Sequence, residues 1–346
     1  MTQQYLRNLS LVVADPAGKG LELGALRCVF ETHRGDTQSP NTCDVKVYNL
    51  SADTANLIYS PEFTQLSMKV GYGAASASGK PPVLQSIFQG SIKQVRLGRE
   101  DQKNSYVAIT AADGDEAYNF SALALTLGAG ATASDVVQSL IKQMATAVAS
   151  SPTGGSAGQQ VTQGYLPTLN ANQFSRGRTL YGLCRDEMRD FAGANDCKWF
   201  IQDGAVELVP NTGYIQAPPV LITPFTGLIG TPEQTQNGLE LTVLMNPSIK
   251  IGRTVQLDYS NINQLRYGTD KESTLLNTLL AQTSTKLSPS GTYYVMKAEH
   301  SGDTRGTPWY TKLTCLATDI TLGVASVGGA AVTPPFPSPR DAVPRY

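Results

Sequence analysis

The chain alternates apolar and polar residues in long runs near its N-terminal end, a pattern typical of half-buried β strands. Glycines between the first two runs predict a hairpin within residues 6–32, and Ser51 is an N-cap for a short helix over Ala52–Tyr59. Roughly six strands and one helix predict a small, closed or nearly closed β barrel over residues 1–120. The runs cover residues 9–13, 21–30, 44–48, 66–72, 87–97 and 106–112.

The β pattern stops between residues 121 and 225, where we expect an α/β insert. Thr132-Ala-Ser-Asp135 is a capping box, and apolar residues at helical spacing extend it into an amphipathic helix to about Ala149. A second helix is predicted over Arg178–Phe191. Asp203-Gly204 predicts the turn of a hairpin over residues 198–209. The segment 151–163 is rich in Gly, Ser and Gln and predicts a loop.

The β pattern returns in residues 226–325, with strands expected at 239–245, 255–259, 293–300 and 310–318. These runs match the first unit in order: 44–50 aligns with 240–246, 70–72 with 257–259, 87–97 with 293–300, and 106–110 with 310–314. The match is imperfect, because the first strand pair leaves a one-residue register ambiguity and the helix lies elsewhere, at Glu272–Gln282 in the second unit. We interpret the match as internal duplication, against chance similarity of two generic β modules. The Pro-rich segment 326–346 predicts an extended tail.

The low fraction of charged residues favours a protein whose surface contacts partner proteins. Charged residues make up 16% of the 346 residues, against roughly 25% in an average soluble protein. The 27 basic and 28 acidic residues nearly cancel, so overall charge attracts neither nucleic acid nor an anionic membrane. No apolar run approaches the ~18 residues of a membrane helix, and the N-terminus lacks a signal peptide pattern. We expect synthesis in the cytoplasm and no membrane insertion.

Residues with catalytic or metal-binding potential are few. Five scattered cysteines, without a Cys-x-x-Cys pair, are expected to be reduced and buried: Cys28, Cys43, Cys184, Cys197 and Cys315. With only His33 and His300 available, a catalytic triad has few ways to form. We therefore expect no enzyme activity, catalytic residue, cofactor or metal.

Several motifs have a structural and a functional interpretation. His300, Asp303 and Arg305 could form an acid/base cluster, but the glycines and Pro308 around them favour a tight turn between strands. Residues 113–116 (Asp-Gly-Asp-Glu) lack the spacing of a calcium loop and are interpreted as a solvated turn.

Other features are assigned to packing or to water. Gly227, Gly230 and Gly238 are expected to permit close approach or positive φ, not phosphate binding. Both tryptophans, Trp199 and Trp309, are assigned to cores or domain seams. A basic stripe faces either DNA in a channel or, as we favour, water: Lys93, Arg96, Arg99 and Lys103.

Three stretches resemble a known family: residues 41–51 with 70–73 and 87–92, residues 226–239 running into 244–258, and residues 300–309. Together they resemble the baseplate hub proteins of contractile-tailed bacteriophages, a family related to the hub part of type VI secretion spikes. The resemblance extends over most of the chain from about residue 6 to 321.

The resemblance implies a fold of two tube-protein-like antiparallel β barrels and a homotrimeric structural hub of the viral baseplate. Three subunits with two similar units each would give pseudo-six-fold symmetry, adapting a hexameric tail tube to a trimeric spike. The implied partners are the tail tube protein, the central spike protein and other baseplate proteins, with possible passage of DNA through a channel during genome ejection. The implied location is the virion, after assembly in the host cytoplasm.

Two rival hypotheses come from other classes. The low charge and Tyr-rich strands would also suit a cell-surface glycan-binding β protein of the tail. A peptidoglycan hydrolase attached to the tail is disfavoured, because no plausible acid/base pair is visible.

Overall fold

The computed structural model describes residues 6–15, 19–60, 63–73, 82–149, 159, 161–235, 238–257 and 291–318. The first β unit comprises β1 (Arg7–Ala14), β2 (Gly20–Glu22), β3 (Cys28–Gly35), β4 (Thr42–Tyr48), α1 (Ala52–Tyr59), β5 (Gln65–Tyr72), β6 (Gln85–Arg99) and β7 (Ser105–Ala112). The insert comprises α2 (Asp115–Phe120), β8 (Ala122–Leu127), α3 (Ala133–Ala149), β9 (Thr162–Gln163), β10 (Arg178–Leu183), α4 (Cys184–Ala194), β11 (Cys197–Gln202) and β12 (Ala205–Pro210). The second β unit comprises β13 (Val220–Ile222), the 3-10 turn η1 (Pro224–Thr226), β14 (Leu228–Thr235), β15 (Gly238–Leu244), β16 (Thr254–Leu257), β17 (Thr292–Asp303) and β18 (Trp309–Ala317).

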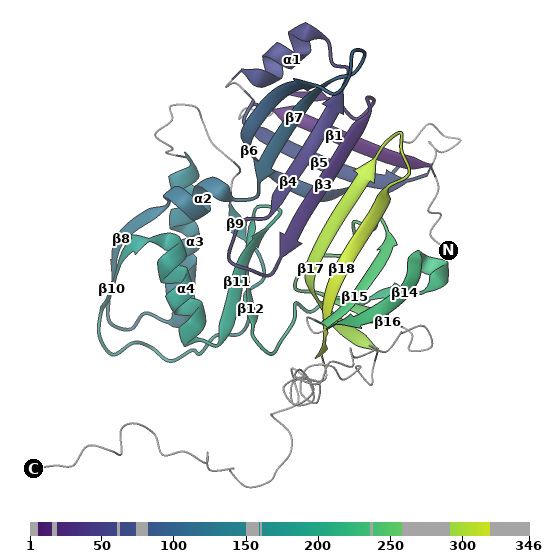
Figure 1. Cartoon of the computed structure of the whole chain (residues 1–346). Helices are drawn as coiled ribbons and strands as arrows, with labels where there is room; N and C mark the ends of the chain where they lie inside the picture. Colours follow the sequence, from purple (N-terminus) through teal and green to yellow (C-terminus); the bar gives the residue numbers. More distant parts are fainter. Residues whose placement is uncertain are drawn as a thin grey trace, which may run out of the picture.

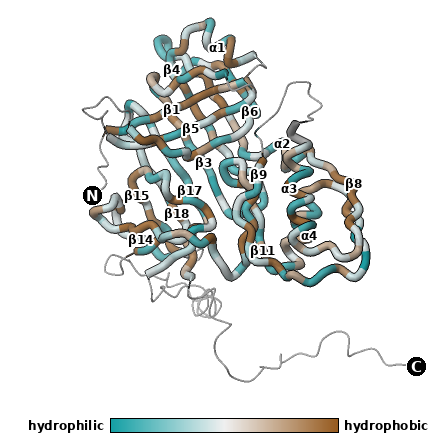
Figure 2. Tube along the Cα trace, turned by 180° about the vertical axis from the view of Figure 1, so that it is seen from behind, coloured by the Kyte–Doolittle hydropathy of each residue, from teal (hydrophilic) through white to brown (hydrophobic). Residues whose placement is uncertain are grey.

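The strands of both β units join in one 13-stranded sheet, with the insert packed at its side (Figure 1). The main path runs β14-β15-β18-β17-β3-β4-β7-β6-β5-β1-β2, and β16 joins β13 to β17 beside it. Apolar and polar residues alternate along these strands (Figure 2), so one face of each unit is buried. The prediction of a mainly β protein with antiparallel strands and an α/β insert is confirmed.

The two β units have the same strand order. It is β3-β4-β7-β6-β5-β1 in the first unit and β14-β15-β18-β17-β16-β13 in the second. The register agrees as well: Asp44 lies opposite Thr110 and Glu240 opposite Thr314, which is the alignment expected from the sequence. The units differ at one end, because β1 is antiparallel to β5 whereas β13 is parallel to β16. Shared order and register support internal duplication.

A bulge in β17 joins the two units. Before the bulge, residues 292–294 pair with β16; after it, residues 297–303 pair with β3 of the first unit. The register shift lies between Val295 and Lys297, and the carbonyl of Met296 accepts a hydrogen bond from the Asp36 N–H. A bulge bends its strand and increases its twist, which here redirects β17 from one neighbour to another.

The described residues form three hydrophobic cores, one in each β unit and one in the insert. Trp309 of β18 is 1% exposed and packs in the core of the first unit, edge-on to Phe30 with ring centroids 5.6 Å apart. Trp199 is buried in the core of the insert. Its neighbour Phe200 points the other way, into the core of the second unit, because side chains alternate along β11. The assignment of both tryptophans to cores or seams is confirmed.

Local predictions succeed where the signal lies within a few residues. The helix α1 has the expected bounds, with the Ser51 hydroxyl accepting from the Thr54 N–H. The capping box before α3 forms: Asp135 accepts from the Thr132 N–H, and the Thr132 hydroxyl accepts from the Asp135 N–H. Asp203 and Gly204 have positive φ in the turn between β11 and β12. All five cysteines are buried.

Two predicted elements are wrong in part. Arg178–Leu183 is strand β10, paired with β8, and the helix begins only at Cys184. Gly182 has a φ of 133°, which an α-helix does not allow. The run 21–30 is also divided: Gly20–Glu22 forms the expected hairpin with β1, whereas Cys28 begins β3, which pairs with β4 and β17.

Some predictions lie outside the described residues: the helix at 272–282, the Pro-rich segment 326–346 and residues 151–158 and 160 of the loop at 151–163. The end of that predicted loop is the short strand β9. Within the described ranges, no helix is long and apolar enough to span a bilayer.

Candidate functional site

The outward face of the joint sheet is a polar surface that both β units build together. On β3, β4, β15, β17 and β18, residues alternate between a buried side and this polar side. The register aligns the polar residues in rows across the strands; one row runs Gln94, Thr110, Asp44, Glu31, Ser301 and Tyr310.

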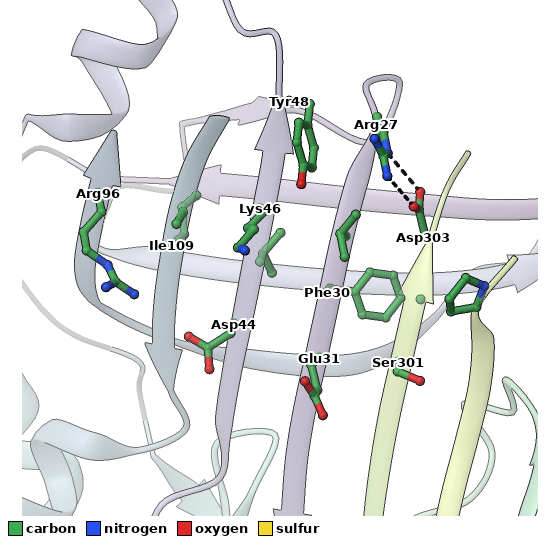
Figure 3. Close-up of a pocket in the computed structure, with 15 residues that line it drawn as sticks. Arg27, Phe30, Glu31, Asp44, Lys46, Tyr48, Arg96, Ile109, Ser301 and Asp303 are labelled. Carbon is green, nitrogen blue, oxygen red and sulfur yellow. Dashed lines mark hydrogen bonds and ion pairs between the residues drawn. The ribbon is translucent and has the colours of Figure 1, made fainter. Parts of the chain in front are cut away.

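Charges of both signs are interspersed on this polar face. The acidic residues are Glu31, Asp44, Glu233, Glu240 and Glu299, and the basic residues are Lys46, Arg96, Lys297 and Lys312. A hollow in this face is lined by residues of both units, among them Arg27, Asp44, Lys46, Arg96 and Asp303 (Figure 3). A balanced polar surface gives no strong attraction for a polyanion.

Each β unit places two carboxylates opposite one another on this face. Asp44 lies opposite Glu31 in the first unit, and Glu240 lies opposite Glu233 in the second. Like charges directly across a strand pair are destabilising. Because both units contain this destabilising pair, we interpret the two carboxylates as serving the function of the surface and not the stability of the fold.

The turn between β17 and β18 ties the second unit to the first. Asp303 forms an ion pair with Arg27 at 2.9 Å and accepts a hydrogen bond from the Arg305 N–H. Thr304 accepts from the Cys28 N–H and donates to the Leu26 carbonyl. Hydrogen bonding to Arg27 and to backbone N–H groups outweighs burial and lowers the pKa of Asp303. The prediction of a tight strand-to-strand turn is confirmed.

The residues of the possible acid/base cluster do not converge. His300 is fully buried in β17, where its Nδ1 lies 2.8 Å from the Thr311 hydroxyl oxygen. Asp303, three residues on, is engaged by Arg27. His33 lies on the polar face, with Nδ1 3.3 Å from Glu299. In the described part of the chain, no group of three or more His, Cys, Asp or Glu side chains could hold a metal ion.

A buried ionic cluster forms where the two β units meet the insert. Asp203, in the Asp-Gly turn of the insert, accepts from Arg34 of the first unit and from Lys250 of the second, each at 2.6 Å. Asp113 accepts from the backbone N–H groups of Asp203 at 2.6 Å and Gly204 at 2.9 Å. The cluster therefore fixes the insert against both units at one point.

The electrostatics of this cluster follow from burial and from its charges. Burial raises the pKa of Asp113 to about 6, and the nearby Asp203 carboxylate adds to the effect. Burial favours the neutral form of Asp203 as well, but Arg34 and Lys250 outweigh it and lower its pKa. Burial, with Arg34 and Lys250 nearby, lowers the pKa of His300 to about 3.

The interpretation of residues 113–116 as a solvated turn is wrong for two of them. Asp113 is 1% exposed and Asp115 is 6% exposed. Asp115 opens α2 and forms an ion pair with Lys93. The alternation in β7 predicts the strand, but nothing local indicates that the turn of the insert would cover its end.

The basic stripe does not act as one group. Lys93 pairs with Asp115, and Arg96 lies on the polar face. Arg99 and Lys103 are exposed beyond it. The glycines predicted to need special backbone conformations behave as expected, since Gly227, Gly230 and Gly238 have φ values of 106°, 70° and 124°. Strand β14 was not predicted from the sequence. Gly227 precedes this strand and Gly230 lies within it, so the alternating pattern is interrupted.

Comparison with known proteins identifies the fold. No family model and no curated protein matches the chain. Among solved structures, the 43 kDa tail protein of prophage MuSo2 from Shewanella oneidensis is similar over 91% of this chain and 98% of its own, with a TM-score of 0.52 at 8% identity. The tail protein from Neisseria meningitidis MC58 is also similar over 91% of this chain and 98% of its own, with a TM-score of 0.50 at 12% identity. The predicted resemblance to phage tail proteins is confirmed at the level of the fold.

Proposed function

We propose that this chain is the structural hub of a phage tail baseplate, acting as a homotrimer with pseudo-six-fold symmetry. The observation that supports it is the repeat: two β units of equal strand order and matching register, fused edge to edge in one sheet. Three copies would present six similar surfaces while the assembly remains three-fold. Such a ring adapts a hexameric tail tube to a trimeric spike. The domains are taken as residues 1–120, 121–225 and 226–325, with the Pro-rich segment 326–346.

The polar face of the sheet lines the channel of the ring in this proposal. Its mixture of Lys46, Arg96 and Lys312 with acidic neighbours supports the assignment, since a balanced surface lets DNA pass without binding it tightly. Genome ejection requires passage and not retention. The role is structural and non-enzymatic.

Partners follow from the arrangement of the three parts. The tail tube protein would bind the side of the ring that repeats six times, and the central spike protein the three-fold side. The insert, held by the buried cluster around Asp203, lies at the side of the sheet and is assigned to other baseplate proteins. The protein would be part of the virion tail after assembly in the host cytoplasm.

Electron microscopy of the purified chain tests this function. We expect a ring with three-fold symmetry and six similar lobes around an open centre. A ring of any other stoichiometry, or a chain that stays monomeric at micromolar concentration in light scattering, would contradict the proposal. Binding of an isolated monomer on a glycan array would instead support the glycan-binding alternative.

A further inference from the structure

A row of polar side chains crosses the buried side of the sheet where the two β units join. Thr32 of β3 lies opposite His300 of β17, and His300 lies opposite Thr311 of β18. All three residues are fully buried. Arg34, two residues after Thr32 and on the same side of β3, is 2% exposed. Burial of polar groups at this point is costly unless each finds a hydrogen-bond partner.

Four buried side-chain atoms at this joint have no hydrogen-bond partner in the described part of the chain: the Thr32 hydroxyl, Arg34 Nε and Nη1, and His300 Nε2. Only Nη2 of Arg34 is engaged, by Asp203. Side chains directly opposite on a strand pair have Cβ atoms about 4.5–5.5 Å apart, so Thr32 and His300 adjoin. Burial, with Arg34 next in effect, lowers the pKa of His300, so the guanidinium lies near the ring. The unpartnered groups therefore lie around one place.

The hydrogen bonds of His300 make its unpartnered nitrogen a donor. The Thr311 hydroxyl accepts from the Asn246 N–H at 3.3 Å and lies 2.8 Å from Nδ1 of His300. We assign the hydroxyl proton to Nδ1, because the other acceptor in reach is the Met245 sulfur at 3.8 Å, and a thioether accepts only weakly. The proton of the neutral ring then lies on Nε2. Every unpartnered nitrogen at the joint is a donor, and the Thr32 hydroxyl can donate as well.

The groups around these donors favour an anion as the missing partner. Arg34 and Lys250 are both cationic, and each donates to Asp203. Asp113 accepts from two backbone N–H groups of the insert, so both carboxylates are engaged by other donors. A metal cation would meet only donors and positive charge. A water molecule would bring two further protons that need acceptors, whereas a small anion satisfies the donors and adds none.

We propose that the joint between the two β units binds one buried monovalent anion of the size of chloride, held by Arg34, His300 and Thr32. Two of these residues come from β3 of the first unit and one from β17 of the second, so the anion links the units from within. The three residues are at most 2% exposed, which favours a small inorganic ion over a phosphate ester or an organic acid. The site lies inside one chain and does not depend on the proposed trimer.

Bromide tests the site directly in crystals of the full chain, because it replaces chloride and scatters X-rays anomalously. After growth in sodium bromide, we expect an anomalous peak within hydrogen-bond distance of Arg34 and His300. Water alone at this place, or bromide peaks confined to the surface of the molecule, would overturn the proposal.

Stability in solution shows whether the anion binds outside a crystal. Sodium bromide replaces sodium gluconate at constant ionic strength, so general screening is unchanged and only the small anion fits the site. Because a ligand of the folded state stabilises that state, each tenfold rise in bromide above its Kd should add about 1.4 kcal/mol to the free energy of unfolding. A bromide peak in the crystal without this dependence would mean binding at crystal concentration only, which would also overturn the proposal.

Two threonine variants separate this site from general effects of the anion. Thr32→Val keeps the shape of the side chain but removes one donor, so the bromide Kd should rise about 10-fold or more, as for loss of a hydrogen bond to a charged group. The matched control is Thr64→Val, just before β5, which also removes a buried hydroxyl without a partner in the described part of the chain and should leave the Kd unchanged. Equal bromide dependence in the two variants would show that the anion binds elsewhere and would contradict the proposal.

Discussion

The two β units also differ at one pair of equivalent strands, β6 and β17. Both bend at a bulge, and both have a second half that leaves its first neighbour. In β17 that half is covered by β3 and His300 is buried; in β6 the same half pairs, among the described strands, with β7 alone, and Leu97 is 48% exposed. The comparison teaches that the burial of equivalent side chains depends on which strand pairs with the edge, and not on the repeated sequence pattern alone.

Loss of Trp309 should have the largest effect on the joint between the units. The Trp309 side chain belongs to β18 of the second unit but packs in the core of the first unit against Phe30. Trp309→Ala therefore removes packing contacts between the two units. We expect the free energy of unfolding to fall by about 3 to 5 kcal/mol in denaturant titration. Phe225→Ala, at a side chain that is 98% exposed, is the control and should change it by less than about 0.5 kcal/mol. A loss confined to a separate, second transition would show that the units fold independently.

The dependence of stability on pH should separate His300 from Asp113. The folded state holds His300 neutral, with a pKa of about 3, so its contribution to stability is present above pH 6.5 and is lost as the pH falls towards 3. Asp113, with a pKa of about 6, acts in the opposite direction: the folded state binds the proton more tightly, so stability rises as the pH falls from 6 towards 4. Between pH 4 and 6 the two contributions oppose one another.

Single variants should reveal each contribution. Relative to the parent chain, Asp113→Asn should make stability fall more steeply between pH 6 and 4, and His300→Gln should make it fall less steeply or rise. Each change in slope should approach ~1.4 kcal/mol per pH unit. Thermal or denaturant midpoints measured across this range test the signs. Parallel curves for parent and variants would mean that neither group changes its pKa on folding.

The smallest effect concerns the opposed carboxylates. Asp44→Asn removes like-charge repulsion with Glu31 and keeps an acceptor for the Thr110 hydroxyl, which donates to Asp44 at 2.6 Å. We expect a gain of about 0.2 to 1 kcal/mol. The equivalent change Glu240→Gln also removes the ion pair with Lys312 at 3.2 Å, so its gain should be smaller. Equal gains at low salt would show that Lys312 does not compensate Glu240.

Sequence alone determined the features that depend on neighbours along the chain. Alternation predicted most strands of the two β units, Ser51 and the Thr132 capping box predicted two helix starts, and Asp203-Gly204 predicted a hairpin. The alignment of the repeats was also readable, because side-chain period and order survive duplication. These signals operate within a few residues, where propensity and capping decide the local conformation.

Only the tertiary structure decided which strand edges meet. The pairing of β3 with β17 joins residues more than 260 positions apart through backbone groups that every residue type possesses, so no side chain marks it in advance. Pairing with β8 likewise made Arg178–Leu183 a strand instead of a helix. Burial of Asp113 depended on where the turn at Asp203 would dock. Long-range contact supplies the desolvation and the hydrogen bonds that local sequence cannot show.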